Sequence, residues 1–132
     1  MDLFDPGHYK GVRRSVGEAE TLPAWCYTAP EFYAREVDRI FTLGWHFVAR
    51  ADELAEPGSY LAVDTVPGPV LLLRDGEGRI GAFANSCRHR GARLLEGHGR
   101  CRTIVCPYHA WTYGADGRLL GALRADRPGP GA

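Results

Sequence analysis

Cys87-Arg88-His89 and, after the 16 residues 90–105, Cys106-Pro107-Tyr108-His109 are the two stretches that decide how this chain folds. Each stretch supplies one thiol and one imidazole, in the same order along the chain. The two pairs can act on one centre only if the loops that carry them meet face to face. The sequence therefore predicts two neighbouring loops that hold a metal centre.

The way the donors are paired distinguishes the possible metals. Thiolate sulfur and imidazole nitrogen bind both zinc and iron, so the donor type alone does not decide. Zinc fingers usually pair cysteine with cysteine and histidine with histidine, whereas each loop here carries one of each. The mixed pairing favours a two-iron site in which both cysteines bind one iron and both histidines bind the other, as in a Rieske [2Fe–2S] centre. A structural zinc module is the remote alternative.

The composition is that of an ordinary single domain. The chain has 132 residues, of which 45% are hydrophobic and 24% charged, and this is long enough to bury a core. Sixteen basic residues balance sixteen acidic ones, so no net charge attracts nucleic acid or an anionic membrane. The longest apolar run, residues 70–73, is far shorter than the roughly 20 residues of a membrane span. The N-terminus has no signal pattern. We expect a cytoplasmic protein that binds neither nucleic acid nor membrane.

A single helix is expected near the N-terminus. Thr28-Ala29-Pro30-Glu31 has the spacing of a capping box, with proline in the first turn. Apolar residues follow at three- and four-residue steps, which is typical of one buried helical stripe. We therefore predict a helix over about residues 29–43 that ends at Gly44. Residues 1–27 show no sustained period and are expected to form an irregular arm.

Beyond Gly44 the apolar period falls to two residues, and glycine and proline turns separate the segments. The expected strands cover residues 45–50, 59–66, 70–74, 80–85, 103–105, 110–113 and 118–120. Short strands joined by tight turns predict a mainly β domain with sandwich or barrel-like packing. Residues 124–132 contain Pro128-Gly129-Pro130-Gly131 and are expected to form a linker-like tail.

The whole pattern resembles the Rieske domain of ring-hydroxylating and related non-haem iron oxygenases. The resemblance rests on the four donors, on Arg90-Gly91 after the first pair and on Pro107-Tyr108 inside the second. The helix and the following segment 44–49 resemble the N-terminal part of the oxygenase α subunits, including the choline and carnitine monooxygenase-like branch. The resemblance implies a Rieske-type antiparallel β-sandwich with two cluster-binding loops over residues 28–123.

The same resemblance implies a role for each donor and a set of partners. Cys87 and Cys106 would bind one iron of a Rieske [2Fe–2S] cluster, and His89 and His109 the other. Electrons would come from a reductase or a ferredoxin and pass to a catalytic oxygenase domain or subunit. A homo-oligomer is compatible with the resemblance, and the oligomeric state is left open. In the family, oxygen is activated at a separate mononuclear iron held by two histidines and a carboxylate in a C-terminal domain. These 132 residues contain no such pattern, so we expect no catalytic residue here.

Two functions therefore remain open. The chain is expected to be the Rieske electron-transfer domain of an oxygenase α subunit, cut off before the catalytic domain. The alternative is a freestanding carrier of the Rieske ferredoxin kind. The helix and the linker-like tail favour the first. The substrate, an aromatic ring or a quaternary ammonium compound, is left open.

Some residues near the loops invite narrower expectations. High-potential Rieske proteins carry a disulfide between the loops, and Ala92 and Tyr108 stand at those places here, which implies the lower-potential kind. Ala110 stands where the family often has glycine, so a positive φ at that position would cost roughly 1 kcal/mol. Cys26 and Cys101 are expected to be buried free thiols.

Other side chains near the loops are expected to be exposed. His98 is predicted to lie in an exposed loop. A group of arginines either docks an acidic electron donor or is simply solvated. The group is Arg88, Arg90, Arg93, Arg100 and Arg102.

Overall fold

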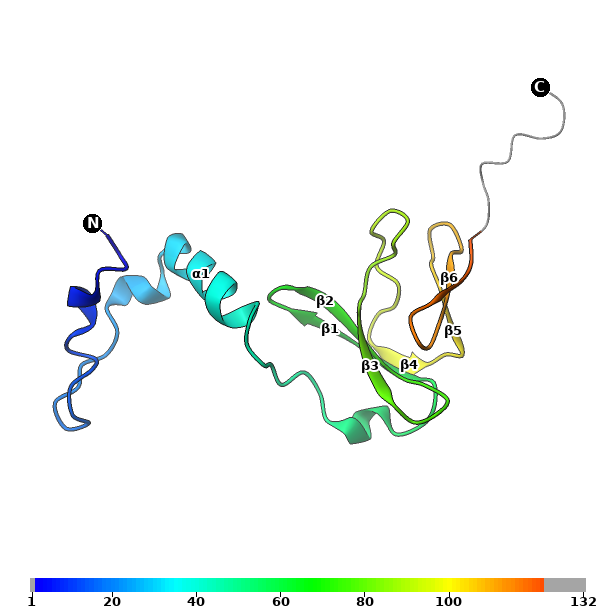
Figure 1. Cartoon of the computed structure of the whole chain (residues 1–132), viewed down its shortest axis with the longest axis horizontal. Helices are drawn as coiled ribbons and strands as arrows, with labels where there is room; N and C mark the ends of the chain where they lie inside the picture. Colours follow the sequence, from blue (N-terminus) through cyan, green and yellow to red (C-terminus); the bar gives the residue numbers. More distant parts are fainter. Residues whose placement is uncertain (1, 123–132) are drawn as a thin grey trace, which may run out of the picture. The chain divides into compact units, whose positions relative to one another are not determined.

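The computed structural model describes residues 2–122, which form two compact units that divide between His46 and Phe47 (Figure 1). The first unit contains the single α-helix, α1 (Pro30–Glu36), which continues as one π-helical turn, Val37–Phe41. The predicted helix is therefore confirmed, in a shorter form. No helix within residues 2–122 is long and apolar enough to cross a bilayer. The predicted tail, 124–132, lies outside the described residues.

The predicted capping box at Thr28 is wrong. Helix α1 has Ala29 as its N-cap, and no side chain caps it. Thr28 instead ends the preceding 3-10 turn, Ala24–Tyr27, and its hydroxyl donates to the carbonyl of Ala24 at 3.4 Å. The threonine side chain is thus already used by the turn before the helix.

Aromatic side chains of the N-terminal arm pack onto the helix. The ring of Phe32 on α1 lies 6.0 Å from that of Phe4 and 6.2 Å from that of Trp25. The arm and the helix therefore belong to the same compact unit. The predicted Rieske domain of residues 28–123 instead includes the helix together with the strands. Its two boundaries, at residues 28 and 123, remain predictions.

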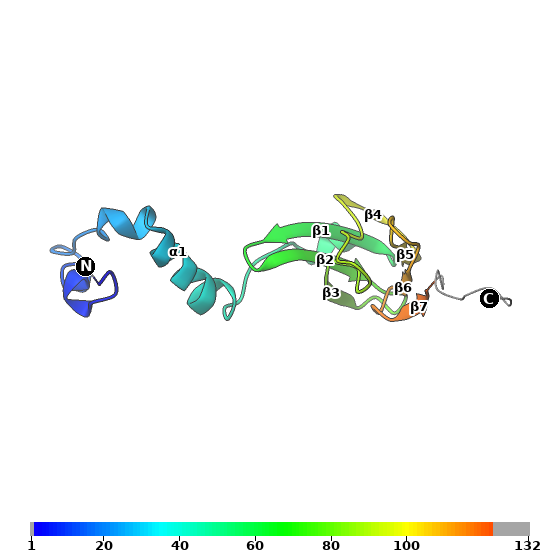
Figure 2. The ribbon, with the colours of Figure 1, turned by 90° about the horizontal axis from the view of Figure 1, so that it is seen from above.

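The second unit consists of two antiparallel sheets (Figures 1 and 2). The first sheet has the order β3-β2-β1-β4, formed by β1 (Ser59–Thr65), β2 (Gly68–Arg74), β3 (Ile80–Ala84) and β4 (His98–Arg100). The second has the order β5-β6-β7, formed by β5 (Thr103–Val105), β6 (Thr112–Gly114) and β7 (Leu119–Gly121). The expected mainly β fold with one N-terminal helix is confirmed.

Two strand predictions are wrong. The segment 45–50 forms no strand, and Trp45 and Phe47 are exposed. Its β-forming residues have no paired neighbour in the described part of the chain. Strand β4 was missed, because His98-Gly99-Arg100 reads as a turn. It forms because it pairs with the start of β1, where His98 lies opposite Leu61. His98 is exposed, as expected, but it lies in this strand rather than in a loop.

The hydrophobic core of this unit includes the two cysteines of the predicted site. Leu71 and Leu73 of β2 are at most 1% exposed. They belong to one cluster of buried residues, whose other members are Cys87, Leu94, Ile104, Cys106 and Tyr113. Both loops are therefore anchored in the core through their first residue.

The two loops share one backbone pattern. In the first, the Cys87 N–H donates to the Ala92 carbonyl, and the Gly91 N–H donates to the Cys87 carbonyl, both at 2.8 Å. In the second, the Cys106 N–H donates to the Trp111 carbonyl at 2.8 Å, and the Ala110 N–H to the Cys106 carbonyl at 3.0 Å. Residues 87–92 and 106–111 thus form two equivalent six-residue turns.

The fifth residue of each turn has a positive φ, which is 70° at Gly91 and 55° at Ala110. Ala110 is the one residue other than glycine with a positive φ in the described part of the chain. The strain expected at this position is therefore present.

A buried amide closes the first loop. Asn85 is 1% exposed and directly follows β3. Its Oδ1 accepts from the backbone N–H groups of Leu94 and Leu95, each at 3.1 Å. Its Nδ2 donates to the Leu95 carbonyl at 2.7 Å. One side chain thus ties the residues before the loop to those after it.

We expect Asn85→Ala to lower the free energy of unfolding by about 2–4 kcal/mol, because it removes three hydrogen bonds and leaves buried backbone groups without partners. Chemical denaturation measures this loss. Ser86→Ala, at the adjacent partly buried position, is the control and should change stability by less than about 1 kcal/mol. Equal effects of the two substitutions would contradict the role of the amide.

We expect Ala110→Gly to raise the free energy of unfolding by up to about 1.5 kcal/mol. The strain of about 1–2 kcal/mol for a left-handed residue with a Cβ exceeds the entropy cost of about 0.4–1 kcal/mol for introducing glycine. Ala92→Gly relieves no strain and also loses packing against the core, so it should destabilise. A lower stability of Ala110→Gly in the same denaturation experiment would show that the strain is absent.

Candidate metal centre

The two cysteines form the buried side of the centre. Cys87 is 3% exposed and Cys106 is 2% exposed. The Tyr113 hydroxyl lies 3.2 Å from Cys87 Sγ, and it accepts a hydrogen bond from the Arg88 N–H at 3.1 Å. A thiolate has no hydrogen to donate, so Tyr113 is the donor when Cys87 is a thiolate.

The surroundings of Cys87 favour a thiolate. Burial acts to raise the pKa of this thiol, but hydrogen bonds outweigh it and leave the pKa below its ordinary value. They come from the Tyr113 hydroxyl, the backbone N–H groups of His89 and Arg90 and the Cys106 side chain. The pKa of Tyr113 is raised, first by burial and then by the bond to Cys87. A thiolate is the form of cysteine that binds metals.

The two imidazoles lie together on the outer side. His89 is exposed and His109 is half-buried. Their ring centroids are 4.7 Å apart, and the rings meet at 67°. Trp111 stacks on His89, with centroids 4.8 Å apart and an interplanar angle of 8°, and Tyr108 packs against His109 at 3.8 Å. The aromatic rings hold both imidazoles in place, so the histidines lie on the outer side of the centre and the cysteines on its buried side.

One buried atom of this site lacks a partner. His109 Nδ1 has no hydrogen-bond partner among the described residues. Buried polar atoms are nearly always satisfied, so an imidazole nitrogen left in this state is suited to hold a metal. A metal-bound group therefore fits the residues present.

The other sequence predictions have mixed outcomes. All four cysteines are free thiols, so no disulfide joins the loops. Cys26 is buried, but Cys101 is only partly buried, and its burial raises its pKa.

Tyr113 was not predicted as a site residue. Its role depends on β6 crossing beneath the first loop, which no local signal in the sequence reveals.

The five arginines near the loops do not all lie around the predicted metal centre. Arg88 and Arg90 are exposed on either side of His89, and Arg93 pairs with Asp64 at 2.5 Å. Arg100 and Arg102 instead line a cavity that contains none of the cluster-loop residues 87–92 and 106–111.

Comparison with known proteins identifies the family. The profile of the Rieske [2Fe-2S] domain matches residues 44–127. The chain is 43% identical over 108 residues to the chloroplastic choline monooxygenase of Spinacia oleracea, covering 82% of this chain and 25% of that protein. It is 44% identical over 110 residues to the glycine betaine monooxygenase oxygenase subunit of Chromohalobacter salexigens, covering 83% of this chain and 24% of that protein.

A solved structure agrees with these matches. The apo form of the quaternary ammonium Rieske monooxygenase CntA superposes with a TM-score of 0.78 at 36% identity, over 86% of this chain and 34% of that one. The chain thus spans about a quarter of the length of these curated relatives. The sequence match, the fold and the two Cys/His loops agree on a Rieske-type [2Fe–2S] cluster as the cofactor. The chain belongs to the Rieske [2Fe-2S] domain family and corresponds to the N-terminal part of Rieske oxygenase α subunits.

Proposed function

We propose that this chain passes single electrons from a reductase or ferredoxin toward a mononuclear iron site that its own residues do not form. Cys87 and Cys106 would hold one iron of the cluster, and His89 and His109 the other. When bound, the cluster would store one electron, at a reduction potential within about −150 to +300 mV. The observation that carries the proposal is the pairing of two buried cysteines with two adjacent, partly exposed imidazoles.

The residues on the buried side of the centre and those on its exposed side would have different roles. Tyr113 donates to Cys87 Sγ and so stabilises negative charge on the sulfur. The buried Nδ1 of His109 is the atom suited to iron, which leaves Nε2 to hold a proton. The exposed ring of His89 would be the surface through which an electron passes to or from a docked partner. Trp111 keeps that ring in place.

The names of the relatives support a substrate class. The curated relatives act, by name, on choline, glycine betaine and carnitine. Naphthalene 1,2-dioxygenase structures match with lower TM-scores, which are 0.66 and 0.67 at 33% identity, and 0.74 at 35% identity for the enzyme from Rhodococcus sp.. An oxygenase that contains this domain would therefore act on a quaternary ammonium compound rather than an aromatic ring.

The assembly and location are proposed on similar support. A quaternary ammonium Rieske monooxygenase is described as using inter-subunit electron transfer. By analogy, this domain would work in a homo-oligomer and deliver its electron to a neighbouring subunit. We also propose a cytoplasmic location, although the plant relatives are chloroplastic.

Reduction by a physiological donor tests the proposal. Purified protein mixed with a reductase or ferredoxin should take up one electron per chain and give the EPR signal of a reduced Rieske cluster. A paramagnetic signal that integrates to one spin per chain confirms electron uptake. Zinc without acid-labile sulfide, or a protein that the donor cannot reduce, would end the proposal.

We expect His109→Cys to lower the reduction potential by on the order of 100 mV, or to prevent cluster assembly, because a thiolate adds negative charge where a neutral imidazole stood. Redox titration followed by EPR measures the change. Cys101→Ser is the control, since Cys101 lies outside the predicted ligand set, and it should leave the potential unchanged. An unaltered spectrum of His109→Cys would remove His109 from that set.

We expect Tyr113→Phe to lower the potential by about 20–60 mV, which corresponds to the loss of one hydrogen bond of about 0.5–1.5 kcal/mol for a one-electron couple. The O–H···S bond stabilises the reduced state more, because that state is more negative. Tyr108→Phe, whose hydroxyl bonds no described residue, should leave the potential unchanged. Equal shifts in both variants would argue against a specific role for the Tyr113 hydroxyl.

A further inference from the structure

A second feature of the β-domain is a cavity of about 600 Å³ that is separate from the metal centre. Its walls come from segments that are distant in the sequence: residues 57–58 before β1, Arg74 and Gly76 at the end of β2, residues 100–102 between β4 and β5, and Ala115 after β6. No residue of the loops 87–92 and 106–111 lines it. The size is within the range of small-molecule sites.

Three arginines and no carboxylate line this cavity. The guanidinium of Arg74 donates to the backbone carbonyls of Leu54, Gly78 and Ala51, the last two at 2.5 and 3.2 Å. Arg100 donates to the Pro57 carbonyl at 3.1 Å. These acceptors position the side chains but carry no charge.

The third arginine, Arg102, is exposed, and no ion pair to it is found within residues 2–122. Neither Arg74 nor Arg100 has an acidic partner in that part of the chain. Three arginines therefore contribute to the wall of one cavity, and no described carboxylate pairs with any of them. An anion in the cavity would be attracted by the positive charges of Arg100 and Arg102.

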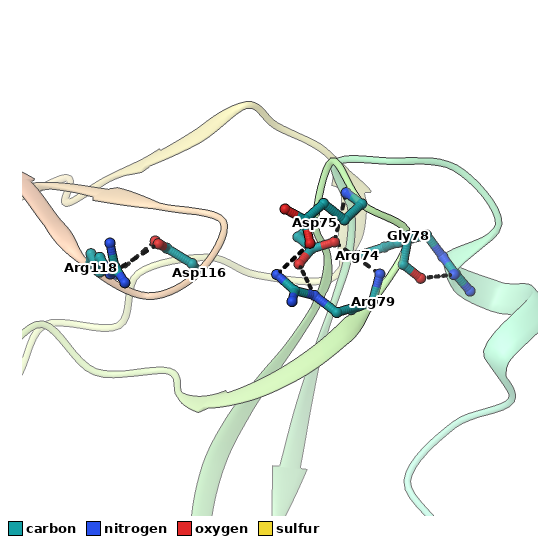
Figure 3. Close-up of polar contacts among 7 residues, drawn as sticks. Arg74, Asp75, Gly78, Arg79, Asp116 and Arg118 are labelled. Atoms are coloured by element: carbon teal, nitrogen blue, oxygen red, sulfur yellow. Dashed lines mark hydrogen bonds and ion pairs between the residues drawn. The ribbon is translucent and has the colours of Figure 1, made fainter.

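Two carboxylates in the neighbouring turns are already engaged. Asp75 pairs with Arg79 at 3.0 Å and Asp116 pairs with Arg118 at 3.3 Å. Figure 3 shows both pairs. Neither Arg79 nor Arg118 lines the cavity. Glu56, beside Pro57, is different, because it forms no ion pair with the described arginines.

The cavity has a rigid floor. Gly58 has a φ of 84°, and a Cβ built on it would lie 2.7 Å from the Cys101 carbonyl oxygen. Its N–H donates to the Arg74 carbonyl at 2.8 Å, and its carbonyl accepts from the Cys101 N–H at 2.9 Å. The backbone thus joins the segments that carry Arg74, Arg100 and Arg102. A site held this firmly loses little entropy when a ligand binds.

We propose that this cavity binds a small molecule bearing a phosphate or carboxylate group. Arg100 and Arg102 would hold the oxygens, because the guanidinium fork matches the geometry of both groups. Arg74 forms part of the wall, while its guanidinium stays on backbone carbonyls of residues outside the lining. The site is independent of electron transfer, and its test does not depend on the proposed function.

Calorimetric titration of the full chain with its cluster loaded tests the site, with inorganic phosphate and malonate as probes at constant ionic strength. We expect saturable binding of at least one probe, and a loss of affinity of about tenfold or more in Arg102→Gln and in Arg100→Gln. Arg118→Gln removes an arginine close to the cavity but outside its lining, and it should change the affinity by less than about twofold.

Two results would overturn the proposal. The first is that neither probe shows saturable binding. The second is that Arg118→Gln weakens binding as much as Arg102→Gln does. The cluster's visible absorption and the far-UV circular dichroism of each variant show that it is folded. Arg102 is exposed, so its substitution should leave both spectra unchanged.

Discussion

The burial of two cysteine side chains in the core between the sheets is the constraint on which the rest of the structure depends. Cys87 and Cys106 share that core with leucines of β2 and with Tyr113 of β6. Buried thiolates are costly unless hydrogen bonds or a metal satisfy them. Two equivalent backbone turns and the Tyr113 hydroxyl meet this need on the protein side. Folding of the loops and binding of the metal are therefore coupled.

The burial of the two cysteines also makes the two sides of the centre different. The sulfur side is closed by the core, while the imidazole side reaches the surface at His89. The aromatic rings of Trp111 and Tyr108 hold the imidazoles, and the amide of Asn85 closes the first loop below them. An electron can thus be stored away from water and exchanged on one defined face, which is what a carrier domain requires.

Much of this could be predicted from the sequence, and what could not has a physical reason. The two Cys/His loops, the helix and most strands follow from spacing and period, because those signals are local. That the four side chains on the loops bind iron stays a prediction. Strand β4 escaped because it forms only by pairing with β1. The Tyr113 hydroxyl and the unpartnered His109 Nδ1 depend on how β6 and the loops meet. The capping box failed because the preceding turn already uses Thr28.

In the proposed centre, two different pairs of donors bind two different irons. Mössbauer spectroscopy of the oxidised, ⁵⁷Fe-labelled protein tests this arrangement most directly, because the technique reports the surroundings of each iron separately. We predict two quadrupole doublets of equal area, one for an iron with sulfur ligands only and one for an iron with two nitrogen ligands. A single doublet, or doublets of unequal area, would contradict it.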